Sequence, residues 1–173
     1  MSNDASNLVM TDDDMKTLLN YNVPADDVET HRRDYETQLA SGKHDLQTTF
    51  QYAWCMTHSK NINDLKKASV LFEEIFKEGT EDLKRDSLFY LAISETKQRN
   101  YCSAKKYIQA FLTVEPTNVQ AAQLKNYIEK RLKKDGITGM ALFGAAAVFG
   151  GVTAIAVGAL AVTAALGFSL KRK

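Results

Sequence analysis

The sequence predicts an all-α fold: a tetratricopeptide-like bundle of five or six antiparallel helices, followed by one C-terminal transmembrane helix. Apolar residues recur at helical spacing through most of the chain, and no stretch of useful length alternates as a strand would. A helix–turn–helix pattern occurs twice, with equivalent residues 36 to 37 positions apart. An uncharged, apolar stretch then covers residues 136–170. Together these patterns favour a helical-repeat domain attached to a membrane.

Residues 1–23 are expected to form an N-terminal arm rather than part of the bundle. Three aspartates at positions 12–14 precede Met15, Leu18 and Leu19. Acidic side chains stabilise the amino end of a helix, where the helix dipole is positive. One short helix is therefore expected within the arm.

The main domain is predicted to cover residues 24–134. Pro24 is placed where a first helix can begin, because proline is tolerated at the first helical position. Gly42 lies just beyond the apolar stripe of that helix, and glycine readily adopts the left-handed conformation that ends helices. The first helix of the domain is thus expected between these two residues.

Two tetratricopeptide repeats follow, at about residues 48–82 and about residues 85–118. In the second repeat, Leu91 and Ala92 precede Ala104-x3-Ile108, and Glu95 is the one poor match to the pattern. The corresponding slots in the first repeat hold Trp54, Cys55, Ala68 and Phe72. Small residues at these slots let the two helices of each hairpin approach closely, and large ones fill the space around the crossing.

Polar residues mark where the later helices begin. Asn63 and Thr80 are expected to be N-caps, because short polar side chains accept hydrogen bonds from the first free backbone N–H groups. Thr117 and Asn118 are expected to start a capping helix over residues 118–134. The apolar face of that helix would cover the end of the repeat stack. Its members are Ala121, Leu124, Ile128 and Leu132.

The uncharged residues 136–170 are predicted to anchor the chain in a membrane, because about 20 apolar helical residues span a bilayer core. A buried helix of a soluble core would carry a polar face, and this stretch has none. The N-terminus is polar and acidic, unlike a cleaved signal peptide. Basic residues flank the stretch and are expected to act in membrane targeting. They are Lys133, Lys134, Lys171, Arg172 and Lys173.

No residue pattern indicates catalysis, and we expect neither a cofactor nor a metal site. His31, His44 and His58 lack metal-ligand spacing with another histidine or with a cysteine. His58 occupies a slot where repeats usually carry tyrosine, so packing is its expected role. Cys55 and Cys102 are expected to be reduced thiols. No nucleic-acid reading motif accompanies the basic residues near the membrane segment.

A concave groove is the expected binding surface of a repeat stack, lined by the first helix of each hairpin. In the first repeat, the lining residues would be Tyr52, Met56 and Lys60. Their equivalents in the second repeat are Phe89, Ile93 and Lys97. Aromatic, aliphatic and cationic side chains suit a peptide or helix with apolar anchors and some acidic residues. The alternative interpretation is that these side chains belong to the core or to a solvated surface.

Several runs of sequence resemble the mitochondrial fission 1 protein family. The similarity covers about residues 46–145 and includes both repeats and the membrane junction. It rests on Phe50 to Cys55, Ser59 to Lys67, Arg85 to Ala92, Glu115-Pro116, Lys133 to Gly136 and Gly139 to Ala141.

This resemblance implies a single-pass, tail-anchored receptor of the mitochondrial outer membrane and of peroxisomes, with its helical domain in the cytosol. It implies that the groove recruits a dynamin-related GTPase, directly or through fission adaptors, and that the arm can lie near this groove. The implied groove residues are Tyr52, Met56, Phe89, Tyr90, Ile93 and Lys97.

Two further expectations concern partners. Small residues at Ala147, Gly151, Ala154 and Gly158 permit weak self-association through the anchor. The alternative function is that of a tail-anchored repeat adaptor for another organelle process, such as membrane contact, clearance or chaperone docking. A chaperone-binding carboxylate clamp needs lysine and asparagine at the inner groove positions, and the residues there are apolar or aromatic. Identification of the partner separates the two functions.

Overall fold

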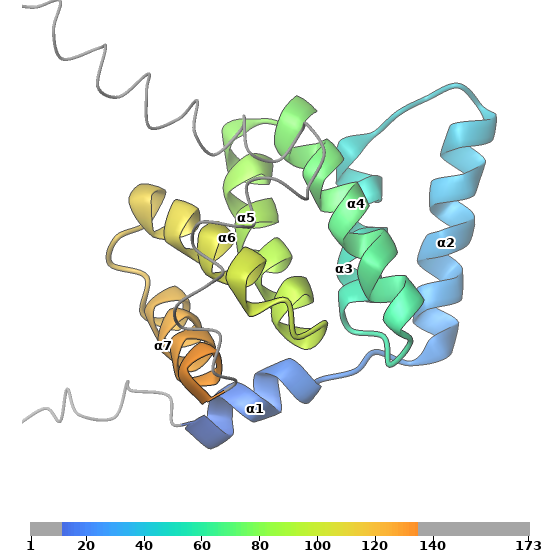
Figure 1. Ribbon diagram of the computed structural model, residues 1–173. Helices are drawn as coiled ribbons and strands as arrows, with labels where there is room; N and C mark the ends of the chain where they lie inside the picture. The colour runs from blue at the N-terminus through green and yellow to red at the C-terminus, as the bar shows by residue number, and fades with distance from the viewer. Residues whose placement is uncertain (1–11, 135–173) are drawn as a thin grey trace, which may run out of the picture. The chain divides into compact units, whose positions relative to one another are not determined.

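A computed structural model describes residues 12–134 (Figure 1). Seven α-helices cover this part of the chain, and it contains no strand. They are α1 (Asp12–Asn20), α2 (Ala25–Ala40), α3 (Leu46–Thr57), α4 (Ile62–Glu78), α5 (Glu81–Lys97), α6 (Tyr101–Val114) and α7 (Val119–Lys134). The all-α prediction is confirmed. The count exceeds five or six because the arm contributes α1 in addition to the six helices of the main domain.

Side-chain caps fix where several helices begin. The Asp45 carboxylate accepts from the backbone N–H groups of Gln47 and Thr48 at 3.2 and 3.1 Å and so caps α3. The prediction that Asn63 caps α4 is wrong. Asn61 is the cap, and its side-chain oxygen accepts from the Asn63 N–H at 3.0 Å. The helix thus starts two residues earlier than the sequence pattern indicated.

The other predicted helix ends are confirmed. Thr80 caps α5 through its hydroxyl, which accepts from the Leu83 N–H at 3.4 Å. The Asn118 side chain accepts from the Ala121 N–H at 2.9 Å at the start of α7. Pro24 immediately precedes α2, and Gly42 adopts a φ of 69° just after it.

The two repeats pack as the small-residue slots predict. Ala68, Ala92 and Ala104 are completely inaccessible to solvent, so no space separates the helices at these crossings. One hydrophobic cluster lies mainly between α3 and α4. Its buried members are Tyr52, Ala53, Met56, Ala68, Leu71, Phe72, Ile75 and Leu91.

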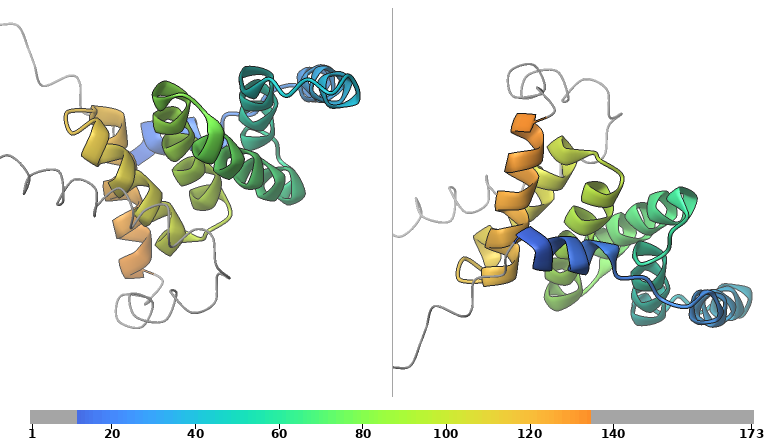
Figure 2. Two further views of the ribbon diagram at one scale, coloured as in Figure 1. Left: turned by 90° about the horizontal axis from the view of Figure 1, so that it is seen from above. Right: turned by 90° about the horizontal axis from the view of Figure 1, so that it is seen from below.

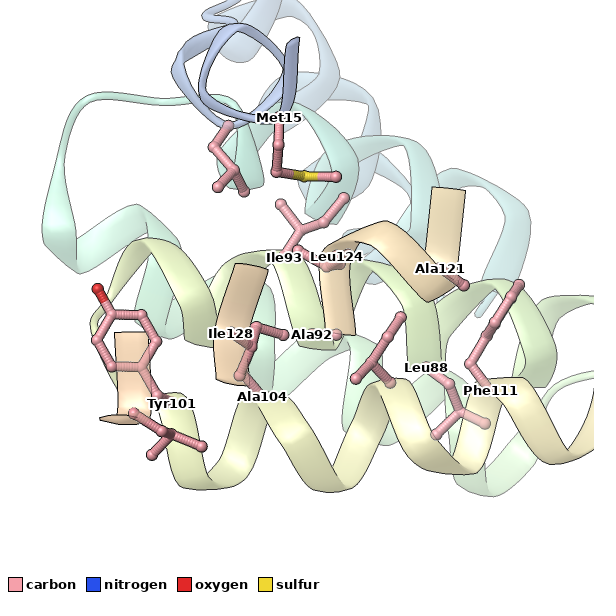
Figure 3. Close-up of a cluster of buried hydrophobic side chains, with 13 residues drawn as sticks. Met15, Leu88, Ala92, Ile93, Tyr101, Ala104, Phe111, Ala121, Leu124 and Ile128 are labelled. Atoms are coloured by element: carbon pink, nitrogen blue, oxygen red, sulfur yellow. The ribbon is translucent and has the colours of Figure 1, made fainter. Parts of the chain in front are cut away.

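A second cluster joins α5, α6 and α7 with α1 (Figure 3). The predicted apolar face of α7 is buried within it, through Ala121, Leu124, Ile128 and Leu132. An ion pair of 2.9 Å between Lys105 and Glu129 also joins α6 to α7. α7 therefore packs its apolar face against α5 and α6.

Glu95, the poor match to the repeat pattern, has a structural role between α4 and α5. Its carboxylate accepts from the Ser69 hydroxyl at 2.8 Å and from the Asn100 amide at 3.0 Å. Burial raises the pKa of Glu95. A polar contact between neighbouring helices thus replaces the aromatic packing that the pattern would place here.

The helix of the arm lies on the domain. α1 runs from beside α7 toward α3 (Figures 1 and 2). Met15 and Leu19 on α1 are only 2% and 7% exposed. The two residues are four positions apart and therefore share one face of the helix. That face is the part of the arm that packs.

Within residues 12–134, none of the helices has both the length and the apolar character needed to cross a membrane. The predicted anchor, residues 136–170, and the basic residues 171–173 lie outside the described part.

Candidate protein-binding site

The six predicted groove residues lie on α3 and α5, and the structure places half of them in the core. Tyr52, Met56 and Ile93 are 3%, 0% and 2% exposed. Phe89, Tyr90 and Lys97 are half-buried. A partner therefore cannot reach Tyr52, Met56 or Ile93 unless a neighbouring element moves.

Tyr52 is shielded by α2 and by α4. Its ring lies 5.1 Å from the ring of Tyr35 on α2, measured between centroids. Its hydroxyl accepts a hydrogen bond from the Lys67 ammonium at 3.3 Å, and the same nitrogen lies 5.3 Å from the centre of the Tyr52 ring. These contacts make Tyr52 part of the α2–α3–α4 packing.

Ile93 is shielded instead by the arm. In Figure 3, Met15 lies over Ile93 and Leu124. All three side chains belong to the same buried cluster, together with Leu19 from α1. α1 is thus a short amphipathic helix whose apolar face lies on α5 and α7. This arrangement is the kind of contact that a groove-binding helix makes with its receptor.

The segment after α1 is attached to the end of α3. The Val23 N–H donates to the His58 carbonyl oxygen at 3.1 Å, and the Tyr21 ring meets the His58 ring edge-on at 5.3 Å. His58 in turn lies 4.5 Å from Trp54 and 6.4 Å from Tyr90, again between ring centroids. The arm is therefore held at two places, by the apolar face of α1 and by this aromatic cluster of Tyr21, Trp54, His58 and Tyr90.

His58 is a packed side chain, as the sequence predicted, and the structure adds a hydrogen bond that fixes its ring. Its Nδ1 lies 2.8 Å from the Trp54 carbonyl oxygen, and the ring nitrogen is the donor because a carbonyl can only accept. Burial lowers the pKa of His58. The imidazole is consequently neutral at physiological pH.

The Lys97 side chain makes a hydrogen bond within the domain. Its ammonium donates to the Thr57 carbonyl oxygen at 2.6 Å, at the carboxyl end of α3. That carbonyl is one of the groups that the end of a helix leaves without a helical partner. Burial lowers the pKa of Lys97. Lys97 therefore stabilises the junction of α3 and α5.

The individual contacts of the arm were not predicted from the sequence, and only the family resemblance placed the arm near the groove. The pattern at Met15 and Leu19 predicted a helix, but nothing in the local sequence indicates which surface it covers. Tyr21 was not singled out at all. The sequence does contain one signal that could have identified Tyr21 as a contact residue: an aromatic residue next to a predicted helix, in a segment otherwise rich in polar residues.

Comparisons with known proteins agree with this architecture. The family model for the Fis1 N-terminal tetratricopeptide repeat matches residues 47–79, and the model for the Fis1 C-terminal tetratricopeptide repeat matches residues 85–137. The mitochondrial fission 1 proteins of Rattus norvegicus and Homo sapiens are each 37% identical over 134 residues, which is 78% of this chain and 88% of theirs. That of Mycosarcoma maydis is 36% identical over 129 residues, covering 75% of this chain and 82% of its own.

Solved structures of Fis1 have the same fold as this chain. Yeast Fis1, crystallised with an Mdv1 fragment that contains N-terminal extension and coiled-coil domains, superposes with a TM-score of 0.63 at 26% identity. The match covers 68% of this chain and 91% of that one. Fis1 from Saccharomyces cerevisiae also gives a TM-score of 0.63 at 26% identity, with coverage of 69% and 92%. The chain belongs to the mitochondrial fission 1 protein family.

Proposed function

We propose that this chain is a tail-anchored receptor for the mitochondrial fission machinery, and that α1 covers the face to which the partner binds. The family consists of tetratricopeptide-like adaptors and not of enzymes. The observation that carries the proposal is the burial of Ile93 beneath Met15 by a helix that precedes the main domain.

The nature of the partner follows from what α1 does. An amphipathic helix with two apolar residues four positions apart already fits this face, so a partner helix with the same spacing would fit it as well. The yeast relative was crystallised with a coiled-coil fragment of Mdv1, which is helical. The partner proposed here is a fission adaptor with such a helix, which would bring a dynamin-related GTPase to the membrane.

The proposed location is the mitochondrial outer membrane, with a second population on peroxisomes. Residues 136–170 would form the single anchor, and the main domain would face the cytosol. Lys133 and Lys134 before the anchor, and the basic residues 171–173 after it, would act in targeting.

Cells that lack the protein test the proposal. Loss of the chain should leave mitochondria elongated and connected, because division fails when its machinery is not recruited. The wild-type chain should restore fragments of normal length, whereas a chain lacking residues 136–173 should not. A chain lacking only residues 171–173 should move toward the endoplasmic reticulum.

Normal mitochondrial and peroxisomal length in the deficient cells would contradict the proposal. The adaptor function in membrane contact, clearance or chaperone docking would then be preferred. Restoration by the chain without its anchor would show that recruitment does not depend on membrane attachment.

A further inference from the structure

Three metal-ligating side chains meet at the surface far from the arm. His44 lies in the turn between α2 and α3, and Glu74 and Glu78 lie one helical turn apart on α4. The His44 Nε2 is 3.1 Å from a Glu74 carboxylate oxygen, and the His44 Nδ1 is 4.0 Å from a Glu78 oxygen. One ligand atom from each residue lies within 4.8 Å of the other two.

This cluster is short of positive charge. Like charges four residues apart on a helix destabilise it, and Glu74 and Glu78 are such a pair. Among the ion pairs of residues 12–134, both carboxylates have His44 as their partner. A neutral imidazole has one N–H and serves only one of the two carboxylates, since its other nitrogen is an acceptor. A divalent cation bound between the three side chains would balance the two negative charges.

We infer that His44, Glu74 and Glu78 form a binding site for a divalent zinc ion. One imidazole nitrogen and two carboxylate oxygens are ligands that zinc accepts, at about 2.0–2.2 Å each, and tetrahedral geometry then puts the ligand atoms about 3.4 Å apart. The present spacing, from 3.1 Å to within 4.8 Å, needs only side-chain rotation to reach that value. Water would complete the coordination, because all three side chains are partly exposed to solvent.

The sequence prediction of no metal rested on the spacing of histidines and cysteines, and here the ligands come from separate elements. His44 is 30 positions before Glu74, and only the packing of α3 against α4 brings them together. A pair of glutamates at helical spacing is too common to indicate a site without the third ligand.

A zinc ion bound by His44, Glu74 and Glu78 would link the α2–α3 turn to α4. α2 contains no fully buried residue; it is held by the apolar contacts of Val28 and Tyr35 and by a 2.7 Å hydrogen bond from the Gln38 amide to the Thr48 hydroxyl. A metal bridge across the turn would therefore stabilise the weakly packed α2 against α3 and α4. The consequence is a domain whose unfolding temperature depends on zinc.

The test uses the full chain in detergent micelles, with zinc chloride alone as the probe, at about pH 8, where an ordinary histidine is neutral. Equilibrium dialysis would measure zinc bound per chain, and thermal unfolding would be followed with and without zinc. His44→Gln and Glu74→Gln/Glu78→Gln remove ligands while preserving shape. His31→Gln, with Glu81→Gln, is the matched control, because it removes a histidine and a glutamate outside the cluster.

The wild-type chain and the control should bind one zinc ion and unfold at a higher temperature when zinc is present. His44→Gln should bind at least about tenfold more weakly, since loss of even an outer-shell partner costs 10–100-fold. Equal binding by the wild type and His44→Gln would overturn the inference, as would no binding by the wild type at micromolar zinc. In the second case, the three side chains form only hydrogen-bonded or ionic contacts at the surface.

Discussion

At the scale of single residues, Phe72 on α4 is the largest side chain in the core that solvent does not reach. The sequence placed it correctly, because it occupies the large-residue slot of the Ala68-x3-Phe72 pattern. Its ring meets the rings of Phe50 and Tyr90 at 5.3 and 5.6 Å. Local pattern and three-dimensional packing agree here because the crossing of two consecutive helices is specified within one repeat.

Replacement of Phe72 by alanine should lower the free energy of unfolding by about 3–5 kcal/mol, because it removes buried contacts and leaves a cavity. Val70→Ala is the matched control on the same helix, since Val70 is 63% exposed. The control should change stability by less than about 0.5 kcal/mol. Urea denaturation followed by circular dichroism measures both, and equal effects would show that α4 is not packed as described.

His58 is the residue at which the sequence predicted the role but not all the contacts. Its packing against Trp54 follows from their separation of four residues at the end of α3, where His58 is the C-cap. Its contact with Tyr21 depends on the path of the arm, which joins parts of the chain 37 positions apart. Such a contact has no local signature.

The neutral state of His58 predicts a loss of stability in acid. Burial lowers the pKa of His58 below the ordinary value of 6.5. As the pH falls below 6.5, the unfolded chain therefore binds a proton at this imidazole before the folded chain does. The stabilisation is complete above pH 6.5 and decreases as the pH falls through the lowered value of the folded state. Urea denaturation at about pH 7.5 and about pH 5.5 should show a smaller loss for His58→Phe than for the wild type.

The quantity that tests the prediction is the difference between the wild type and His58→Phe in how the free energy of unfolding changes with pH. Glu95 acts with the opposite sign, because burial raises its pKa and the folded state binds its proton more tightly. Glu95 is present in both proteins, so its contribution cancels. An identical pH dependence in the wild type and His58→Phe would contradict the buried, neutral state of His58.

At the scale of elements, α1 shows which features of a helix the sequence pattern predicts and which it does not. The acidic start and the apolar residues after it correctly predicted a short helix in the arm. The structure adds the face that packs, since Met15 and Leu19 are buried and Thr17 is exposed. The receiving surface could not be predicted from the local pattern, because Ile93 and Leu124 lie on helices that are distant in sequence; only the family resemblance placed the arm near the groove.

Contacts between helices that are distant in sequence also explain why predicted groove residues are buried. The repeat pattern predicted which residues of α3 and α5 occupy equivalent positions, but equivalence does not specify their neighbours. Tyr52 is covered by Tyr35 from α2, and Ile93 by Met15 from α1. Both covering helices lie outside the two repeats from which the groove was predicted.

Detachment of α1 should follow from two substitutions. Met15→Ser with Leu19→Ser removes buried apolar groups worth about 1.5–3 kcal/mol each, and a nine-residue helix is not stable alone in water. Hydrogen exchange should become faster in α1 and around Ile93, whereas Thr17→Ala on the exposed face should leave both unchanged. Preserved protection around Ile93 in the double variant would show that α1 does not shield it.

At the scale of the whole molecule, charge is distributed unevenly along the chain. Residues 1–36 carry nine acidic and three basic residues, a net charge of −6, and residues 97–134 carry nine basic and two acidic residues, a net charge of +7. Seen from below, the amino end of α1 lies beside the middle of α7 and away from the carboxyl-terminal end of α7, where most of its basic residues are placed (Figure 2). The contact of α1 with the domain is therefore the apolar one made by Met15 and Leu19.

The helical domain should fold without the predicted anchor. Every residue of the two hydrophobic clusters lies between Met15 and Leu132. Deletion of residues 136–173 should therefore leave a soluble protein with a helical circular dichroism spectrum and one cooperative thermal transition. An aggregated product, or one without a cooperative transition, would show that the deleted residues contribute to the core.

The binding of a fission adaptor to the face beneath α1 is the central claim, and titration calorimetry with a coiled-coil adaptor fragment tests it most directly. Because α1 and the partner compete for this face, Met15→Ser with Leu19→Ser should lower the dissociation constant by raising the fraction of uncovered domain. Adding Ile93→Ala to that variant should weaken binding by about tenfold, as expected for a central apolar anchor. Circular dichroism would confirm that each variant is folded. Weaker binding by the Met15→Ser/Leu19→Ser variant would show that α1 is part of the binding site, and an unchanged constant in all variants would place the site elsewhere.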